Sequence, residues 1–176
     1  GKIIVGTKVH QKLLEMYAKG IVIGGTSAGA AIMSHEMLTG GQMFPRTPEA
    51  RTSNTCEVIK RNNVMIRSGL GFIRDVIIDQ HFVVMRRQNR LISQALERPN
   101  LLGLGIDEAT AVVVKPDRTF EVIGKSVVIV YDASKVRNVR TDQFGNLSGQ
   151  NIIVHVLIAG ERFDINNRQV IYDNAR

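Results

Sequence analysis

The alternation of apolar and polar residues along the chain predicts a first half of mixed helices and strands and a second half built mainly of strands. Apolar residues at helical spacing predict helices over residues 7–19, 28–37 and 86–96. Short apolar runs predict strands over residues 21–25, 64–66, 75–78, 101–106, 127–131 and 152–158, and a hairpin of residues 111–114 and 119–123. This order of elements predicts an α/β core with an antiparallel extension at its C-terminal end. We expect residues 1–176 to form a single domain.

The composition narrows the range of partners. The formal net charge is +7 and the isoelectric point is about 9.9, which can indicate binding to nucleic acid. The basic residues are spread along the chain and aromatic residues make up only 5%, so we expect no nucleic-acid partner. No apolar run approaches the ~20 residues that a membrane span requires, so we also expect no membrane partner. Cys56 is the only cysteine, which excludes an internal disulfide and favours a cytoplasmic location.

The sequence GTSAG at residues 25–29 is the strongest chemical signal in the chain. It follows a predicted strand and opens a predicted helix, which is the setting of a nucleophile elbow with Ser27 at its tip. Gly25 and Gly29 would relieve crowding in the tight turn. The backbone N–H of Ala28 could then donate to a developing oxyanion. The alternative interpretation is an ordinary strand-to-helix turn in which Ser27 caps the helix.

A serine nucleophile needs a base to remove its proton. The chain has four histidines. His10 and His35 lie on predicted helices, where we expect His10 to be solvated and His35 to be structural or exposed. His155 lies inside a predicted strand, where a side chain is usually packed. His81 follows the predicted strand 75–78, and ligands bind at strand ends in open α/β sheets. We therefore predict His81 as the base.

The base needs an acid to orient it. Asp107 and Glu108 close the apolar run 101–106, and one of these two carboxylates could accept from the second ring nitrogen of His81. A second combination, Ser27 with Asp132 and His155, follows the chain order of ordinary α/β-hydrolases and ranks lower. No histidine pair or acidic cluster has the spacing of metal ligands, so we expect neither a metal nor another cofactor.

Several separate blocks together resemble the cyanophycinases and their peptidase E-like relatives, the serine peptidases of family S51. In chain order the blocks are GGTSAGAAIM at residues 24–33, DQHF at 79–82, Arg87 with NRL at 89–91, GIDEATA at 105–111, VHVL at 154–157 and GERFD at 160–164. The resemblance covers nearly the whole chain from residue 6 onwards. Blocks that occur in the right order are far more specific than the elbow alone.

The resemblance implies Ser27 as nucleophile, His81 as base and Glu108 as the orienting acid. It implies a mainly parallel sheet flanked by helices, similar to class I glutamine amidotransferases and flavodoxin-like proteins, often in a homodimer. The implied reaction is exolytic hydrolysis of cyanophycin, a poly-aspartate with arginine on each β-carboxyl group, to β-Asp-Arg dipeptides. No cofactor is implied.

Four further residues are candidates for substrate binding. Arg87 and Arg90 lie one helical turn apart, so both can face one ligand, and arginine binds carboxylates through two hydrogen bonds. Without the resemblance, a solvated helix start would be the simpler interpretation of Arg87. Asp79 and Gln80 precede the base and could bind amide or ammonium groups of a substrate.

The sequence departs from the family pattern at two points. Met85 stands where the family usually has an arginine, and the upstream Gly-Gly-x-Gln segment that offers a second oxyanion donor is not in this sequence. We expect upstream strands of the sheet to be missing from this chain. We also expect the long segment 40–62 to cover the site or to set its specificity. The alternatives are an Asp-specific or isoaspartyl dipeptidase and a family member that binds peptides but has lost catalysis.

Overall fold

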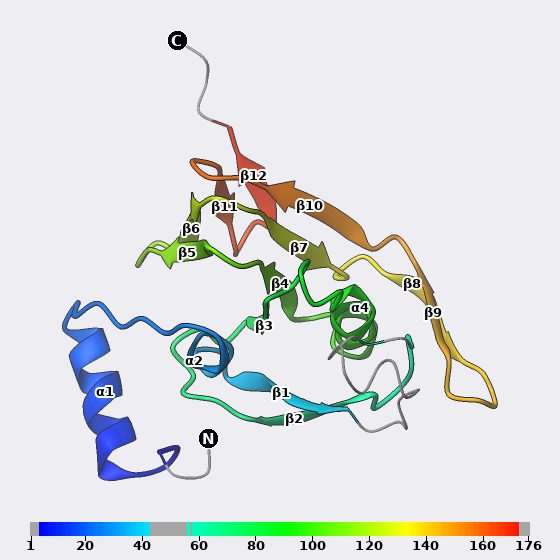
Figure 1. Cartoon of the computed structure of the whole chain (residues 1–176), viewed down its shortest axis with the longest axis horizontal. Coiled ribbons are helices and arrows are strands. Elements are labelled where there is room, and N and C mark those ends of the chain that lie inside the picture. The colour runs from blue at the N-terminus through cyan, green and yellow to red at the C-terminus, as the bar shows by residue number, and fades with distance from the viewer. Residues whose placement is uncertain (1–3, 43–55, 57, 173–176) are drawn as a thin grey trace.

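Figure 1 shows a computed structural model of the chain, which describes residues 4–42, 56 and 58–172. The helices are α1 (Lys8–Ala18), α2 (Ala28–Ala31) and α4 (Gln88–Glu97). The strands are β1 (Glu36–Gln42), β2 (Val64–Ser68), β3 (Val76–Gln80), β4 (Leu102–Ile106), β5 (Thr110–Val114), β6 (Thr119–Gly124), β7 (Val128–Asp132), β8 (Arg137–Thr141), β9 (Leu147–Gln150), β10 (Ile153–Leu157), β11 (Arg162–Asp164) and β12 (Gln169–Ile171).

Two four-stranded sheets form the body of the protein. The first has the order β10-β7-β4-β3, and within the described residues β3 and β4 are its one parallel pair. The second has the order β12-β11-β6-β5 and is antiparallel throughout. The antiparallel pairs β1–β2 and β8–β9 complete the set, and β8–β9 extends away from the two sheets (Figure 1).

The prediction of a mainly parallel, flavodoxin-like sheet flanked by helices is wrong, because the described strands pair mostly antiparallel. Parallel neighbours need a crossover of about a dozen residues or more. The connection that carries α4 between β3 and β4 is long enough, and it joins the parallel pair. The connections from β4 to β5 and from β6 to β7 span three residues each, 107–109 and 125–127, which is too short for a crossover helix.

The start of the chain also differs from the prediction. Residues 21–25, all of them in the described part of the chain, form no strand, and Val22 is 93% exposed. The helix predicted over residues 28–37 ends at Ala31, because the chain turns there and enters β1. Strand β1, the β8–β9 pair and the strands β11 and β12 were not predicted. The other predicted helices and strands are found, with ends that differ by one or two residues.

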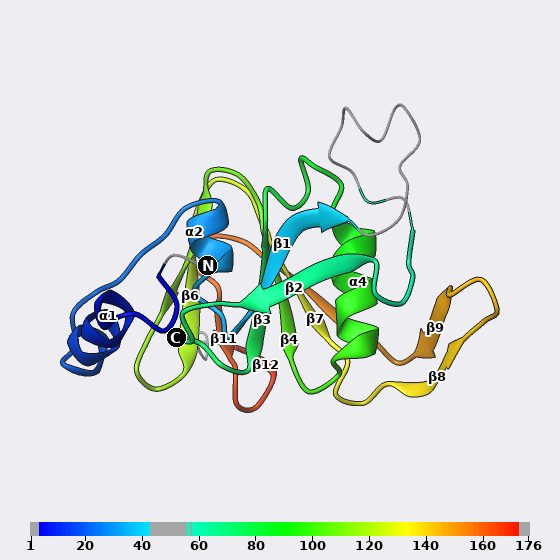
Figure 2. The same ribbon diagram turned by 90° about the horizontal axis from the view of Figure 1, so that it is seen from below.

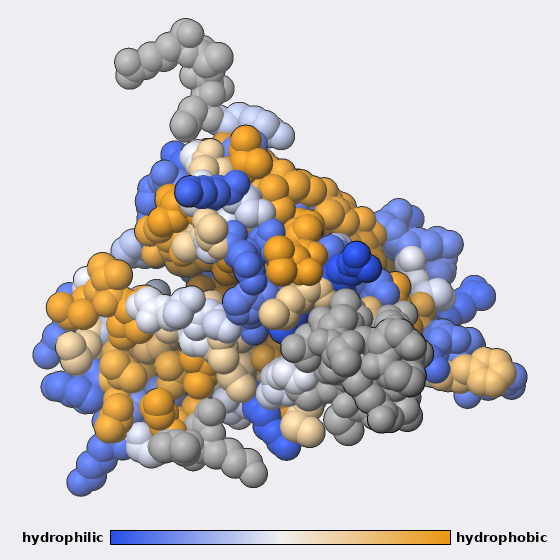
Figure 3. Space-filling model, viewed as in Figure 1, coloured by the Kyte–Doolittle hydropathy of each residue, from blue (hydrophilic) through white to orange (hydrophobic). Residues whose placement is uncertain are grey.

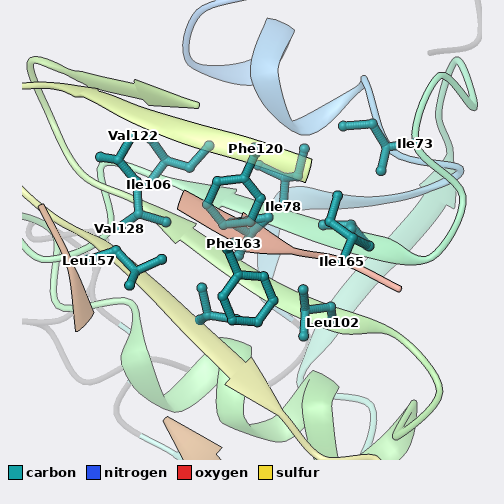
Figure 4. Close-up of a cluster of buried hydrophobic side chains, with 13 residues drawn as sticks. Ile73, Ile78, Leu102, Ile106, Phe120, Val122, Val128, Leu157, Phe163 and Ile165 are labelled. Atoms are coloured by element: carbon teal, nitrogen blue, oxygen red, sulfur yellow. The ribbon is translucent and has the colours of Figure 1, made fainter. Parts of the chain in front are cut away.

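The larger hydrophobic core lies between the two four-stranded sheets. Val76, Ile78, Leu104 and Val130 of the first sheet face Phe120 and Phe163 of the second, as Figure 4 shows for the labelled members. The rings of Phe120 and Phe163 stack at a centroid distance of 5.4 Å. Both rings are fully buried, and burial of a large apolar side chain stabilises a fold by roughly 1.5–3 kcal/mol.

The opposite face of the first sheet is covered by α4 and by the β1–β2 pair (Figure 2). Leu91 of α4 and Phe82 are fully buried in this second cluster. Gly105 of β4 makes room for Phe82, because a Cβ at this glycine would lie 2.3 Å from the ring. The close contact holds the segment after β3 against β4.

Helix α1 packs loosely beside this body. None of its eleven residues, all described, is buried. It is held by the Tyr17 ring against Phe72 at 5.0 Å and by a 2.8 Å hydrogen bond between His10 Nε2 and the Leu70 carbonyl. No described helix is both long and apolar enough to span a membrane.

Candidate active site

Ser27 has the backbone conformation of a nucleophile at the tip of a strained turn. Its φ is 55° and its ψ is −124°, a region that residues with a side chain rarely adopt. Its hydroxyl caps no described N–H group of α2, which argues against the helix-cap interpretation. The Ser27 Oγ lies 2.9 Å from His81 Nε2 instead.

Gly25 is the glycine that the turn requires. A Cβ at Gly25 would lie 2.2 Å from the Gly29 carbonyl oxygen and 2.7 Å from the Met33 methyl carbon. At Gly29, by contrast, no heavy atom of the described residues outside its own helix backbone and chain neighbours lies within 4 Å of such a Cβ. The expected crowding is therefore found at the first glycine of the motif and not at the second.

His81 directly follows β3, where the chain leaves the sheet. Its φ is 51°, and its carbonyl accepts a 2.9 Å hydrogen bond from the N–H of Met85, which closes a turn. The next residue, Phe82, is fixed by the packing against Gly105 described above, and its N–H donates to the Ile106 carbonyl. The imidazole is therefore presented at the strand end by a turn that is attached to β4.

Glu108 lies in the short connection between β4 and β5. Its Oε1 is 3.0 Å from His81 Nδ1. An ionised carboxylate can only accept a hydrogen bond, so Nδ1 carries the proton and Nε2 is left to accept from the Ser27 hydroxyl. Ser27, His81 and Glu108 therefore form one continuous hydrogen-bonded series, the arrangement that serine hydrolases use to activate a nucleophile.

Three of the nine described non-glycine residues with positive φ lie at this series. Ser27, His81 and Ala109, which follows Glu108, all have φ between 51° and 55°. Such conformations cost of order 1–3 kcal/mol each and cluster at functional sites. Three segments that are far apart in the sequence therefore bring strained residues to one place.

The N–H of Ala28, the predicted oxyanion donor, is the first of α2. It makes no hydrogen bond to another described group of the chain. An N–H in this position, directly after the nucleophile, suits a developing negative charge on a substrate oxygen. Its role in catalysis stays a prediction.

A cavity of about 710 Å³ opens beside Ser27. It lies between the segment 22–27 and the edge of β5, and the surface is hollowed there in Figure 3. Its apolar lining includes Phe72, Ile78 and Val112, and its polar groups include those of His81 and Glu108. Among the described residues that line it there is no lysine or arginine.

The predicted substrate-binding residues lie behind the triad. Asp79 is fully buried, and its carboxylate accepts from Nε of Arg90 at 2.6 Å, from Nη2 of the same side chain and from the Gln80 N–H at 2.8 Å. Arg87 Nη1 lies 3.6 Å from the same carboxylate and donates to the Gln80 carbonyl. Gln80 lines the cavity, and its buried Oε1 has no described hydrogen-bond donor. Substrate binding by these residues stays a prediction, and the structure gives Asp79 and Arg90 a buried ion pair.

The second predicted combination is not assembled. The His155 ring lies edge-on to Phe163 at 5.3 Å. The Asp132 carboxylate accepts from Arg168 Nη1 at 2.6 Å and from the Ser134 N–H at 2.8 Å. Neither residue lines the cavity beside Ser27.

Sequence analysis missed the wall of the cavity that β5 supplies. All five residues of β5, Thr110–Val114, line the cavity, and Thr110, Val112 and Val114 are less exposed than the two residues between them. The two-residue period was visible in the sequence, but nothing in it placed this strand next to the elbow. Within the described residues, no group of three His, Cys, Asp or Glu side chains could hold a metal ion.

The geometry is that of a serine hydrolase site, and comparison with known proteins identifies the family. The family model of peptidase family S51 matches residues 2–122. The chain therefore belongs to peptidase family S51.

Proteins named cyanophycinase are among its relatives. The chain is 36% identical to the one from Trichormus variabilis over 154 residues, which is 86% of this chain and 48% of that protein. It is 33% identical to the one from Geminocystis herdmanii over 171 residues, which is 95% of this chain and 58% of that protein. It is 34% identical to the one from Synechococcus elongatus over 152 residues, with 85% and 44% covered. The chain spans about half the length of the curated relatives that it matches.

Proposed function

We propose that the protein is a serine-type exopeptidase in which Ser27 is the nucleophile, His81 the base and Glu108 the orienting acid. The observation that carries this proposal is the hydrogen-bonded series Ser27 Oγ–His81 Nε2–Glu108 at 2.9 and 3.0 Å. Membership of peptidase family S51 supports it. The homodimer, the cytoplasmic location and the lack of a nucleic-acid partner stay predictions from the sequence.

The reaction proceeds in two halves. Ser27 Oγ attacks the scissile carbonyl carbon while its proton passes to His81 Nε2, and the Ala28 N–H donates to the carbonyl oxygen as it becomes negative. His81 returns the proton to the leaving amine, so that an acyl-enzyme remains. Water then attacks the ester with the same base, and the acid product leaves. Glu108 holds the imidazole in the required tautomer and stabilises the imidazolium.

Cyanophycin is the substrate that we propose, with β-Asp-Arg as the product. Three of the relatives are named cyanophycinase and cover most of this chain. The free acceptor of Gln80 and the Glu108 carboxylate give the cavity groups that suit the N–H donors of an arginine-bearing substrate. Met85, where the family usually has an arginine, weakens recognition of the polymer's carboxylates.

The apolar lining of the cavity favours a second candidate within the same chemistry. No described cationic side chain lines it, and Arg90 is committed to Asp79. An isoaspartyl dipeptide with an apolar second residue, such as β-Asp-Leu, would place its side chain against the lining. This is the isoaspartyl dipeptidase alternative, and it needs the same three catalytic residues.

The test is release of product from purified cyanophycin and from β-Asp-Leu, with Ser27→Ala as the inactive variant. Ser148→Ala is the matched control, because Ser148 is an exposed serine of β9. We expect wild type and Ser148→Ala to release β-Asp-Arg at equal rates. Ser27→Ala should lose at least about 10³-fold in kcat. No product from either substrate with folded wild type would refute the peptidase and leave a peptide-binding protein.

A further inference from the structure

Asp107 stands next to Glu108, but its carboxylate does not reach His81. Instead, its Oδ1 accepts hydrogen bonds from the N–H groups of Val83 at 3.0 Å and Val84 at 3.1 Å. These two residues form the turn that directly follows the histidine. The residue before the orienting acid is therefore bonded to the backbone just after the base, and Asp107 is only 8% exposed.

The other oxygen of Asp107 is held by Ser126, which lies just before β7. Ser126 Oγ donates to Asp107 Oδ2 at 2.6 Å, and the Ser126 N–H donates to Thr110 Oγ1 at 2.9 Å. Thr110 Oγ1 donates in turn to the Glu108 carbonyl at 3.1 Å. Ser126 thus ties together the residues on both sides of Glu108.

Hydrogen bonds keep the Asp107 carboxylate ionised. Burial alone would raise the pKa of this carboxyl group, but the Ser126 hydroxyl and the backbone N–H groups of Val84, Glu108 and Val83 outweigh it and hold the pKa below the usual value. Both oxygens of Asp107 therefore accept hydrogen bonds at neutral pH. Charge-assisted bonds of this kind are roughly twice as strong as neutral ones.

We propose that Asp107 and Ser126 are positioning residues, which fix the distance between His81 Nδ1 and the Glu108 carboxylate. The inference rests on the proposed function, since it assigns these residues to the same site. His81 lies beyond the last hydrogen-bonded residue of β3, and Glu108 beyond that of β4. The sheet therefore does not by itself set their separation. The hydrogen bonds from the Val83 and Val84 N–H groups to Asp107 join the two connections directly, and Ser126 holds the Asp107 carboxylate in place.

The test compares Asp107→Ala, Ser126→Ala and Ser126→Thr in the purified protein. A displacement of about 1 Å at a catalytic group can cost on the order of 100-fold in rate. We expect kcat for β-Asp-Arg release to fall about 100-fold in Asp107→Ala and about 10-fold in Ser126→Ala, with KM changed less than about twofold. Ser126→Thr keeps the hydroxyl and should restore most of kcat.

A spectroscopic signal reports the same geometry without turnover. The proton on His81 Nδ1, held by Glu108, should give a downfield resonance in proton NMR spectra of the wild type. We expect this resonance to broaden or vanish in Ser126→Ala and to return in Ser126→Thr. If wild type proves inactive on every peptide, the proposed function fails, while this resonance still tests the positioning role.

Asp142→Ala is the matched control. Asp142 also accepts from two backbone N–H groups, those of Phe144 at 2.9 Å and Asn146 at 2.8 Å, but it does so in the turn between β8 and β9. Its removal should leave kcat and the resonance unchanged. The proposal is overturned if folded Ser126→Ala keeps both wild-type kcat and the wild-type resonance. It is also overturned if kcat falls equally in Asp142→Ala, because the loss would then reflect general destabilisation.

Discussion

Arg90 offers a direct test of whether the buried ion pair behind the triad is structural or binds substrate. Arg90→Met removes the two hydrogen bonds that this side chain donates to Asp79 and keeps most of the side-chain volume. Asp79, which is fully buried, would keep the Gln80 N–H at 2.8 Å and the Arg87 guanidinium at 3.6 Å. A carboxylate buried without its main partner is strongly destabilising.

The magnitude follows from the burial of both groups. Removal of one partner from a buried ion pair costs roughly 3–5 kcal/mol, and the remaining contact with Arg87 places Arg90→Met at the lower end, about 3 kcal/mol. For a chain of this size each kcal/mol shifts Tm by roughly 2–4 °C. We therefore expect Tm to fall by about 6–12 °C.

Thermal unfolding followed by circular dichroism measures the shift, with Arg98→Met as the matched control. Arg98 pairs with Glu36 at 2.6 Å, but the two side chains are 29% and 39% exposed, and ion pairs that solvent reaches contribute only about 0–1 kcal/mol. Asp79→Asn combined with Arg90→Met should recover most of the lost stability, because neither buried charge remains. If Arg90→Met melts within about 2 °C of wild type but loses cyanophycin hydrolysis, the structural reasoning is refuted and Arg90 is a substrate ligand.

Two further predictions concern the elbow and acid stability. Gly25→Ala should lower the free energy of unfolding by about 1–3 kcal/mol and abolish measurable hydrolysis, because its Cβ would lie 2.2 Å from backbone. Gly24→Ala is the control: no described heavy atom counted lies within 4 Å of its Cβ, so urea unfolding and product assays should show no change. Burial would raise the pKa of Asp132, but the hydrogen bonds from Ser134 and Arg168 outweigh burial and hold the pKa of the folded protein below the ordinary value of 3.8. The Asp132 carboxylate therefore stabilises the fold above pH 3.8, and this stabilisation is lost as the pH falls through the pKa of the folded protein. Urea unfolding from pH 7 down to pH 2 should therefore show a shallower acid decline for Asp132→Asn than for wild type, and equal declines would contradict this assignment.

The candidate site could be predicted from the sequence because its chemistry is carried by short local motifs. The GTSAG segment determines the turn at Ser27, and the strand ends before His81 and Glu108 were visible as the ends of apolar runs. The structure brings these three side chains into hydrogen-bond distance. The residues alone left open which of the adjacent carboxylates Asp107 and Glu108 orients His81, and the family resemblance implied Glu108. In the structure Glu108 contacts the His81 ring, whereas Asp107 accepts from backbone N–H groups.

The arrangement of the strands was not predictable in the same way. An apolar run such as residues 101–106 indicates a buried strand but not the direction of its neighbour. The long connection that holds α4 allows β3 and β4 to pair in parallel. No local signal predicts that β4 and β7 pair antiparallel, because the β5–β6 hairpin lies between them in the sequence. Residues 21–25 have the composition of a buried strand, yet they find no strand partner among the described residues, and propensity alone cannot supply one.

His81 is held in place by buried carboxylates on both sides of it in the chain. On its N-terminal side, Asp79 accepts hydrogen bonds from the buried Arg90, which fixes the C-terminal end of β3. On its C-terminal side, Asp107 binds the backbone of the following turn and is itself held by Ser126. The imidazole is thus placed by a carboxylate contact on each side, neither of which touches the ring. A histidine with φ of 51° needs such support, because this backbone conformation is costly by itself and the hydrogen bonds to Ser27 and Glu108 are made in it.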